Sequence, residues 1–394
     1  MKTLLLALVF CTAAMADSDT VPLKQSATAP IQGASESMIA PGATKGEAPL
    51  PAGKKPQAQE GQPAQPYIAS IDTFGSSHIN EVNLKETLGS ELQAWLNKGL
   101  KGDPTAPEIE KQLTAKIKAK FDVATADWSI IQYFETDDLA IHVTLDVVEK
   151  KDVAKRMPFS AAPTGEFKDP DGLIAAWNTY EDTALDLVEA GQVEPEAEEC
   201  VAFHCPFGHK HAQLKKYEKI FVDGVKKHAD TLLKIQAQDK RADYRAAATY
   251  LLAYLKDGHK VVDAMVGRIH DPDATVRNNA LRVLGDVAEF HPDLVIPHKP
   301  VLEALNFPRV SDRSKALYVL YLLTLNSGQV RDELLKSTVP TLLTLMACKQ
   351  PDHQEISHAI LRKLSGKEFA QTDARAWENW YLHVQKDRGV SSKP

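Results

Sequence analysis

The residues best able to do chemistry are gathered in one short stretch, residues 200–211. Pro206 and Gly208 interrupt this stretch, so we expect it to be a loop. It holds five side chains of the types that bind zinc or copper, four of which could complete a metal site: Cys200, His204, Cys205, His209 and His211. The sequence therefore offers candidate chemistry at a single place in the chain.

Three interpretations of this loop stay open. The first, which an oxidising compartment favours, is a local disulfide between Cys200 and Cys205. The second is a metal site whose candidate ligands are His204, Cys205, His209 and His211, although their spacing is not that of a known zinc finger. The third is free thiols, in which case Cys205 and His209 could form a nucleophile and its base; no orienting third group is evident.

Helices on both sides must position this loop. Before it, apolar residues at helical spacing predict a long helix that starts near Leu173 and closes near Gly191. After it, residues 214–235 predict further helix, which we interpret as one end cap of the structure that follows. We place residues 151–238 together as a helical region that carries the loop.

That structure is an internal repeat. Three eight-residue segments, which begin at Arg245, Arg277 and Arg313, superimpose without a gap, with Arg, Ala and Leu at the same three positions in each. A second amphipathic segment follows each one, at residues 261–269, 294–305 and 334–348. A helical hairpin that recurs at this interval cannot bury its apolar face alone, so we expect the copies to stack into a solenoid.

The repeated residues resemble HEAT repeats in their short bacterial, PBS-lyase-like version, most closely at residues 271–285. The resemblance covers about residues 239–348, and it implies an α-α superhelix that mostly binds proteins. We expect Arg245, Arg277 and Arg313 to form a structural ladder by pairing with an Asp of the adjoining repeat; the alternative is that they line a surface for acidic ligands. Residues 349–394 depart from the pattern and are predicted to be a helical end cap.

Residues 67–150 follow a different pattern. They read as strand, helix, helix, strand, strand, with helices at residues 82–98 and 106–120 and a last strand in which apolar residues alternate from Leu139 to Val147. The element order and the spacing of Ile71, Phe74, Gly75 and Ile79 resemble a POTRA module, a resemblance that implies partner recognition by strand addition at a sheet edge. An unrelated small α/β sandwich would give similar patterning.

The N-terminal residues predict export. Lys2, an apolar core from Leu4 to Phe10 and the small residues before Ala16 make up a secretory signal that would be cleaved between Ala16 and Asp17. Residues 17–66 contain eight prolines and no aromatic residue, so they are expected to form a disordered tether. The protein is then periplasmic or secreted, and no segment is long and apolar enough to cross a bilayer.

The fold class is therefore mainly α, a HEAT-like solenoid preceded by a small α/β domain and a disordered linker. The net charge of −7 argues against nucleic acid as the main partner, and no cofactor is predicted. We expect an exported, non-catalytic scaffold for protein–protein interaction in the cell envelope. The alternatives are a metal-binding or enzymatic protein centred on residues 200–211, and a component of an envelope assembly complex.

Overall fold

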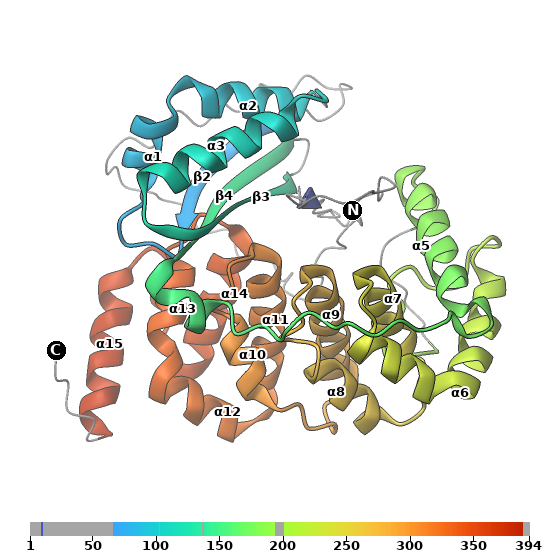
Figure 1. Cartoon of the computed structure of the whole chain (residues 1–394). Helices are drawn as coiled ribbons and strands as arrows, with labels where there is room; N and C mark the ends of the chain where they lie inside the picture. The colour runs from blue at the N-terminus through green and yellow to red at the C-terminus, as the bar shows by residue number, and fades with distance from the viewer. Residues whose placement is uncertain (1–8, 11–65, 102, 136–137, 194–200, 389–394) are drawn as a thin grey trace. The chain divides into compact units, whose positions relative to one another are not determined.

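The computed structural model describes residues 9–10, 66–101, 103–135, 138–193 and 201–388 (Figure 1). The predicted signal peptide, with Ala16 and Asp17, the tether and Cys200 therefore lie outside the described residues, apart from Val9, Phe10 and Pro66. Two compact units make up the chain: the first is Met1–Arg156 with Cys348–Gln350, and the second is Met157–Ala347 with Pro351–Pro394. The prediction of a mostly helical chain with one small sheet is confirmed.

The sheet of the first unit is mixed. Its central strand β4 (Asp138–Glu149) pairs in parallel with β2 (Pro66–Phe74) and antiparallel with β3 (Val123–Glu135). A two-residue strand, β1 (Val9–Phe10), pairs antiparallel with β3 at Ile130 and Ile131. The order is thus β1-β3-β4-β2.

Three helices follow β2, namely α1 (Glu81–Leu88), α2 (Ser90–Leu100) and α3 (Ala106–Lys120). The prediction of one unbroken helix over residues 82–98 is wrong. The chain breaks at Gly89, whose φ of 53° lies in the left-handed region that glycine adopts without strain, and whose N–H donates to the carbonyl of Lys85 (2.7 Å). The predicted apolar stripe nevertheless spans both helices.

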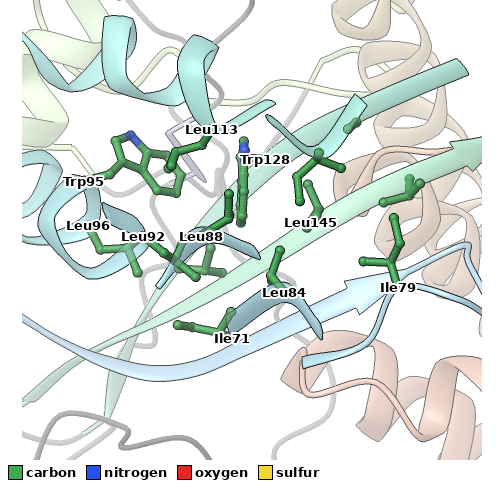
Figure 2. Close-up of a cluster of buried hydrophobic side chains, with 14 of the residues drawn as sticks. Ile71, Ile79, Leu84, Leu88, Leu92, Trp95, Leu96, Leu113, Trp128 and Leu145 are labelled. Carbon is green, nitrogen blue, oxygen red and sulfur yellow. The ribbon is translucent and has the colours of Figure 1, made fainter. Parts of the chain in front are cut away.

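The helices bury that stripe against the sheet (Figure 2). The indole rings of Trp95 on α2 and Trp128 on β3 lie 5.0 Å apart at their centroids. The alternation predicted for β4 holds for its apolar positions, but the polar residues between them are buried as well. Asp146 there accepts a hydrogen bond from the hydroxyl of Ser129 on β3 (3.0 Å), which satisfies a polar group that the alternation alone would place in water.

After two short helical turns, Lys150–Asp152 and α4 (Val153–Arg156), the second unit begins. A turn at Pro170–Gly172 leads into α5 (Leu173–Glu189), and α6 (Lys215–Gln238) follows the Cys/His loop. The remaining helices alternate between two layers (Figure 1). One layer comprises α7 (Ala242–Leu252), α9 (Ala274–Phe290), α11 (Val310–Asn326) and α14 (Pro351–Ser365).

The second layer covers the first from one side. It comprises α8 (Gly258–Val266), α10 (His298–Ala304), α12 (Gly328–Glu333), a π-helical turn at Leu334–Thr338 and α13 (Val339–Met346), and α15 (Ala374–Asp387) packs beside α13. The helix predicted over residues 294–305 is wrong in its first turn, because α10 starts only after Pro297, which occupies the N-cap position outside the helix. Fully buried Trp377 of α15 donates its indole N–H to the carbonyl of Ala370 (3.0 Å), as an end cap requires.

Candidate functional site

The three repeated arginines make the same internal contact. Each Nη1 donates to the backbone carbonyl six residues earlier: Arg245 to Asp239 (2.9 Å), Arg277 to Asp271 (2.9 Å) and Arg313 to Phe307 (2.8 Å). The side chain thus closes the turn that leads into its own helix. The exposed fractions of these arginines are 2%, 2% and 0% respectively.

Two of these arginines also bind the next repeat. Arg245 donates through Nε (3.0 Å) and Nη2 (2.8 Å) to the two carboxylate oxygens of Asp271, and Arg277 donates through the same two nitrogens (3.0 and 2.8 Å) to Oδ2 of Asp312. Both carboxylates are fully buried. Arginine holds a carboxylate in a fixed orientation through paired N–H donors, so each contact sets the register of two adjoining repeats.

Arg313 ends this series beside a histidine. Fully buried His353 lies on α14, the helix next to α11, and its pKa is held well below its usual range by burial and by the charge of Arg313. The imidazole is therefore neutral. The third arginine of the series thus lies beside a neutral ring.

An extended segment lies along this row of arginines; we call residues 157–169 the strap. The ring of Phe159 packs under the guanidinium of Arg277 (4.0 Å), and the N–H of Ser160 donates to the carbonyl of His270 (2.8 Å). Further along, the strap pairs with the turn before α7 through two backbone hydrogen bonds, Gly165 N–H to Gln238 and Lys240 N–H to Gly165. Nη2 of Arg241 also donates to the carbonyl of Phe167. With every ladder arginine buried, these side chains do not form a surface for acidic ligands.

The Cys/His loop packs on an aromatic cluster instead of opening a site. His209 is buried and its Nε2 lies 2.7 Å from the hydroxyl of Tyr254, while Sγ of Cys205 lies 3.7 Å from the same hydroxyl. Tyr180 donates its own hydroxyl to the carbonyl of Gly208 (2.9 Å). Burial lowers the pKa of His209 and raises that of Tyr254, so both groups stay neutral near pH 7.

The four candidate metal ligands contact different groups. Nδ1 of His204 lies 2.6 Å from the carboxylate of Asp286 on α9, and its ring stacks on Tyr250 with centroids 5.2 Å apart. His211 accepts from the N–H of Gln213 (3.3 Å). Within the described part of the chain, no three His, Cys, Asp or Glu side chains converge on a possible metal position. The pairing of Cys200 with Cys205 stays a prediction, because Cys200 lies outside the described residues.

Sequence reasoning missed a second group of polar side chains, which lies on the layer α7, α9, α11 and α14. Asn278 and Arg282 lie one turn apart on α9, and Nε of Arg282 donates to Oδ1 of Asn278 (3.0 Å). The remaining amide nitrogen of Asn278 and Nη2 of Arg282 are buried without a hydrogen-bond partner among the described residues. Lys315 on α11 lies close enough to Arg282 for the two like charges to oppose each other.

Charged side chains of both signs extend this group onto α5, α11 and α14. On α5, burial and then the charge of Asp182 raise the pKa of Glu181 to about 7, against a smaller lowering by Arg282. On α11, burial and then the charge of Arg282 lower the pKa of Lys315 to about 7, while Asp352 of α14 raises it by a smaller amount. On α14, burial and then the charge of Asp352 raise the pKa of Glu355. We call Glu181, Arg282, Lys315, Asp352 and Glu355 the charged row.

The repeat itself contained a signal for this surface. The position five residues after each ladder arginine is Tyr250 on α7, Arg282 on α9 and Tyr318 on α11, whereas the Ala and Leu positions hold constant. Positions that vary between otherwise equal copies are not needed for stacking, and they are where a repeat protein places its specific contacts. Five of the eight positions vary, so a comparison of the copies includes Arg282 and Lys315 among the variable positions without singling either out.

Comparisons with known proteins add little to this description. No protein-family model matches the chain. No curated protein matches it either. Among solved structures, a designed armadillo repeat protein is similar at 14% sequence identity and a TM-score of 0.31, over 50% of this chain and 92% of that chain. In the described part of the chain, every helix is too short or too polar to span a membrane.

Proposed function

We propose that this chain is a non-catalytic scaffold with HEAT-like repeats, which binds a protein partner on the face formed by α9, α11 and α14. The observation that carries the proposal is the charged row. Arg282 of α9 and Lys315 of α11 lie near enough for their charges to repel, and Nη2 of Arg282 is buried without a partner among the described residues. Groups left in this state cost folding stability, and they are retained where they bind something.

The helical stack suits such a role because the register of its repeats does not depend on that face. Register between repeats is fixed by Arg245 with Asp271 and by Arg277 with Asp312, on the edge that the strap covers. Side chains on the row can then vary without disturbing the stack. A repeat array offers a partner a long, continuous surface of this kind.

A photo-crosslinking amino acid tests the proposal in intact producing cells. We would place it at exposed Glu355 on the charged row and, as a matched control, at exposed Lys299 on α10 in the other layer. We expect a discrete crosslinked protein from position 355 and none from position 299. Equal crosslinking at both positions, or none at either, would refute a partner on this face.

We further propose that the chain is exported, on the strength of Lys2, the apolar core and Ala16 alone. The mature protein then starts at Asp17 and is located in the periplasm or outside the cell. N-terminal sequencing of protein from the extracytoplasmic fraction should give Asp17. A chain that still begins at Met1 in the cytoplasmic fraction contradicts export.

The same export favours a disulfide between Cys200 and Cys205. Removal of the signal peptide leaves three cysteines, of which the third is Cys348. Thiol titration of the denatured protein should find one thiol before reduction and three after it, with no stoichiometric metal by elemental analysis. Three thiols before reduction together with bound zinc or copper would support the metal-binding alternative instead.

The sheet of the first unit supplies a second candidate surface. Strand β3 pairs with β4 from Val123 to Glu135, whereas β1 meets its other edge only at Ile130 and Ile131 among the described residues. The backbone of an edge strand can pair with an added strand, as the resemblance to POTRA modules implies. Pro at position 127 of β3 should abolish capture of any partner that binds in this way, while the charged-row crosslink persists.

A further inference from the structure

The groups of Asn278 and Arg282 on α9 that lack a partner among the described residues are hydrogen-bond donors. Asn278 is 8% exposed, and its Oδ1 accepts from Arg282, so the orientation of the amide is fixed and its Nδ2 is the group left over. Arg282 uses Nε for this bond and leaves Nη2 over. Lys315 adds a cation that lies near Arg282 and makes no hydrogen bond or ion pair with the described residues. A ligand for these groups must therefore accept hydrogen bonds and carry negative charge.

The nearby carboxylates do not fill this role. Glu181 lies near enough to Arg282 to sense its charge, yet its pKa is raised to about 7, whereas a carboxylate bound by an arginine would have a lowered pKa. Asp352 acts on Lys315 more weakly than the repulsion by Arg282 does. The protein thus holds two cations together without closing them by an internal ion pair.

We propose that Asn278, Arg282 and Lys315 form a binding site for a carboxylate, supplied by an acidic side chain of the protein partner. This inference rests on the proposed function and names the chemistry of the contact. Two N–H donors, one from the amide and one from the guanidinium, suit the two oxygens of a planar carboxylate. The adjacent Glu181 and Asp352 disfavour a doubly charged phosphate, because a second negative charge would face these two carboxyl groups.

Proton uptake should accompany binding. Burial and then the charge of Arg282 on α9 lower the pKa of Lys315 to about 7, and Asp352 on α14 opposes them more weakly. A bound carboxylate favours the charged form of Lys315, so the affinity should fall as the pH rises from about 6 to about 9. Glu181, whose pKa is also about 7, loses its proton over the same range and weakens an anion further.

The test uses the full chain and a short blocked peptide that contains two glutamates, with its glutamine counterpart and inorganic phosphate as the other probes. Binding is measured by calorimetry at constant ionic strength. We expect the glutamate peptide to bind at pH 6 and the glutamine peptide not to. We expect no phosphate binding at pH 8, where phosphate is mostly doubly charged and Glu181 is ionised. Binding should weaken by about tenfold or more in Arg282→Gln and in Lys315→Met, and should be unchanged in Lys363→Met, which removes an exposed lysine of α14.

Each other outcome overturns the inference. Equal binding of the glutamate and glutamine peptides would show that the site does not recognise a carboxylate. Binding of phosphate alone would show that the ligand is a phosphate. Unchanged affinity in Arg282→Gln and Lys315→Met would show that the peptide binds elsewhere. Thermal unfolding of the same variants shows that they fold. If crosslinking from position 355 persists in Lys315→Met and Arg282→Gln, the scaffold stands and this site fails; if the wild-type chain gives no crosslink, the scaffold fails.

Discussion

Helix α9 carries two arginines, five residues apart, whose guanidinium groups have opposite environments. Arg277 donates to the carboxylate of Asp312 and to the carbonyl of Asp271, and its guanidinium lies over the ring of Phe159. Among the described residues, Arg282 has one hydrogen bond, to Asn278, and a buried Nη2 without a partner. The difference comes from α11, which offers the first arginine Asp312 and the second one Lys315. The type of residue does not decide the role; the neighbour on the next helix does.

The comparison implies that the paired and the unpaired cation contribute to the free energy of unfolding with opposite signs. A buried, paired cation stabilises the fold only while its partner is present, since loss of one partner leaves an uncompensated buried charge. A cation held next to another cation already costs stability, and its removal should relieve that cost. Substitutions in the two groups should therefore move the free energy of unfolding in opposite directions.

The largest effect is expected at the paired arginine. Arg277→Met leaves Asp312 buried without its partner and removes the contact with Phe159, so the free energy of unfolding should fall by about 3–5 kcal/mol. Urea denaturation at pH 7 measures the change. Adding Asp312→Leu to this variant should restore much of the loss, because it removes the unpaired charge. A loss below about 1 kcal/mol in the single variant would show that the ladder does not hold the stack.

His353, beside the last ladder arginine, should make the free energy of unfolding depend on pH in the acid range. The pKa of His353 in the folded chain is well below 6.5, while the unfolded chain takes up a proton near 6.5, so the unfolded state binds more protons as the pH falls. Stability should therefore decline below pH 6.5 by roughly 1.4 kcal/mol per pH unit from this residue, until the folded pKa is reached. His353→Leu should flatten the decline between pH 6.5 and 5. An unchanged slope would mean that burial and the charge of Arg313 do not keep the imidazole neutral.

Substitution of the unpaired Lys315 should raise the free energy of unfolding, whereas substitution of Arg277 lowers it. The pKa of Lys315 is about 7 in the folded chain against 10.5 in the unfolded one, so its cost is fully present below pH 7 and disappears as the pH rises to about 10.5. Lys315→Met should raise the free energy of unfolding by about 1–2 kcal/mol at pH 6, a figure discounted because the side chain is only partly buried. The gain should shrink by pH 10, and Lys363→Met should show no gain at either pH. A loss of stability in Lys315→Met would reverse the comparison.

The sequence predicts the paired side of this comparison better than the unpaired side. The ladder arginines recur at equal positions, and the Asp partner of Arg245 lies where the repeat expects it, six residues before Arg277. The partner of Arg277 lies instead one residue before Arg313, because Phe307 occupies the equivalent position in the third copy. Arg282 and Lys315 fall at positions where the copies differ, so periodicity alone says nothing of them.

The Cys/His loop shows the same limit of sequence patterns. Residue types and spacing cannot show that His204 faces Asp286 while His209 faces Tyr254, since both partners come from distant helices. The break at Gly89 was hidden because the apolar stripe runs on through it, from Leu84 to Trp95. Sequence patterns report which residues are buried, but they do not report which buried polar groups find each other.

The smallest and sharpest effect is expected between two adjacent asparagines of α9. Both are almost equally buried, at 8% exposed for Asn278 and 7% for Asn279. Nδ2 of Asn279 donates to the carbonyl of Ala246 on α7 (3.2 Å), whereas Nδ2 of Asn278 has no partner in the described chain. Asn279→Ala should therefore lose about 1 kcal/mol more than Asn278→Ala, where relief of an unsatisfied donor offsets the lost bond to Arg282. Thermal and urea unfolding of the two variants measure the difference. Equal losses would mean that Asn278 has a partner after all, and the contrast between paired and unpaired groups on α9 would then rest on Arg282 and Lys315 alone.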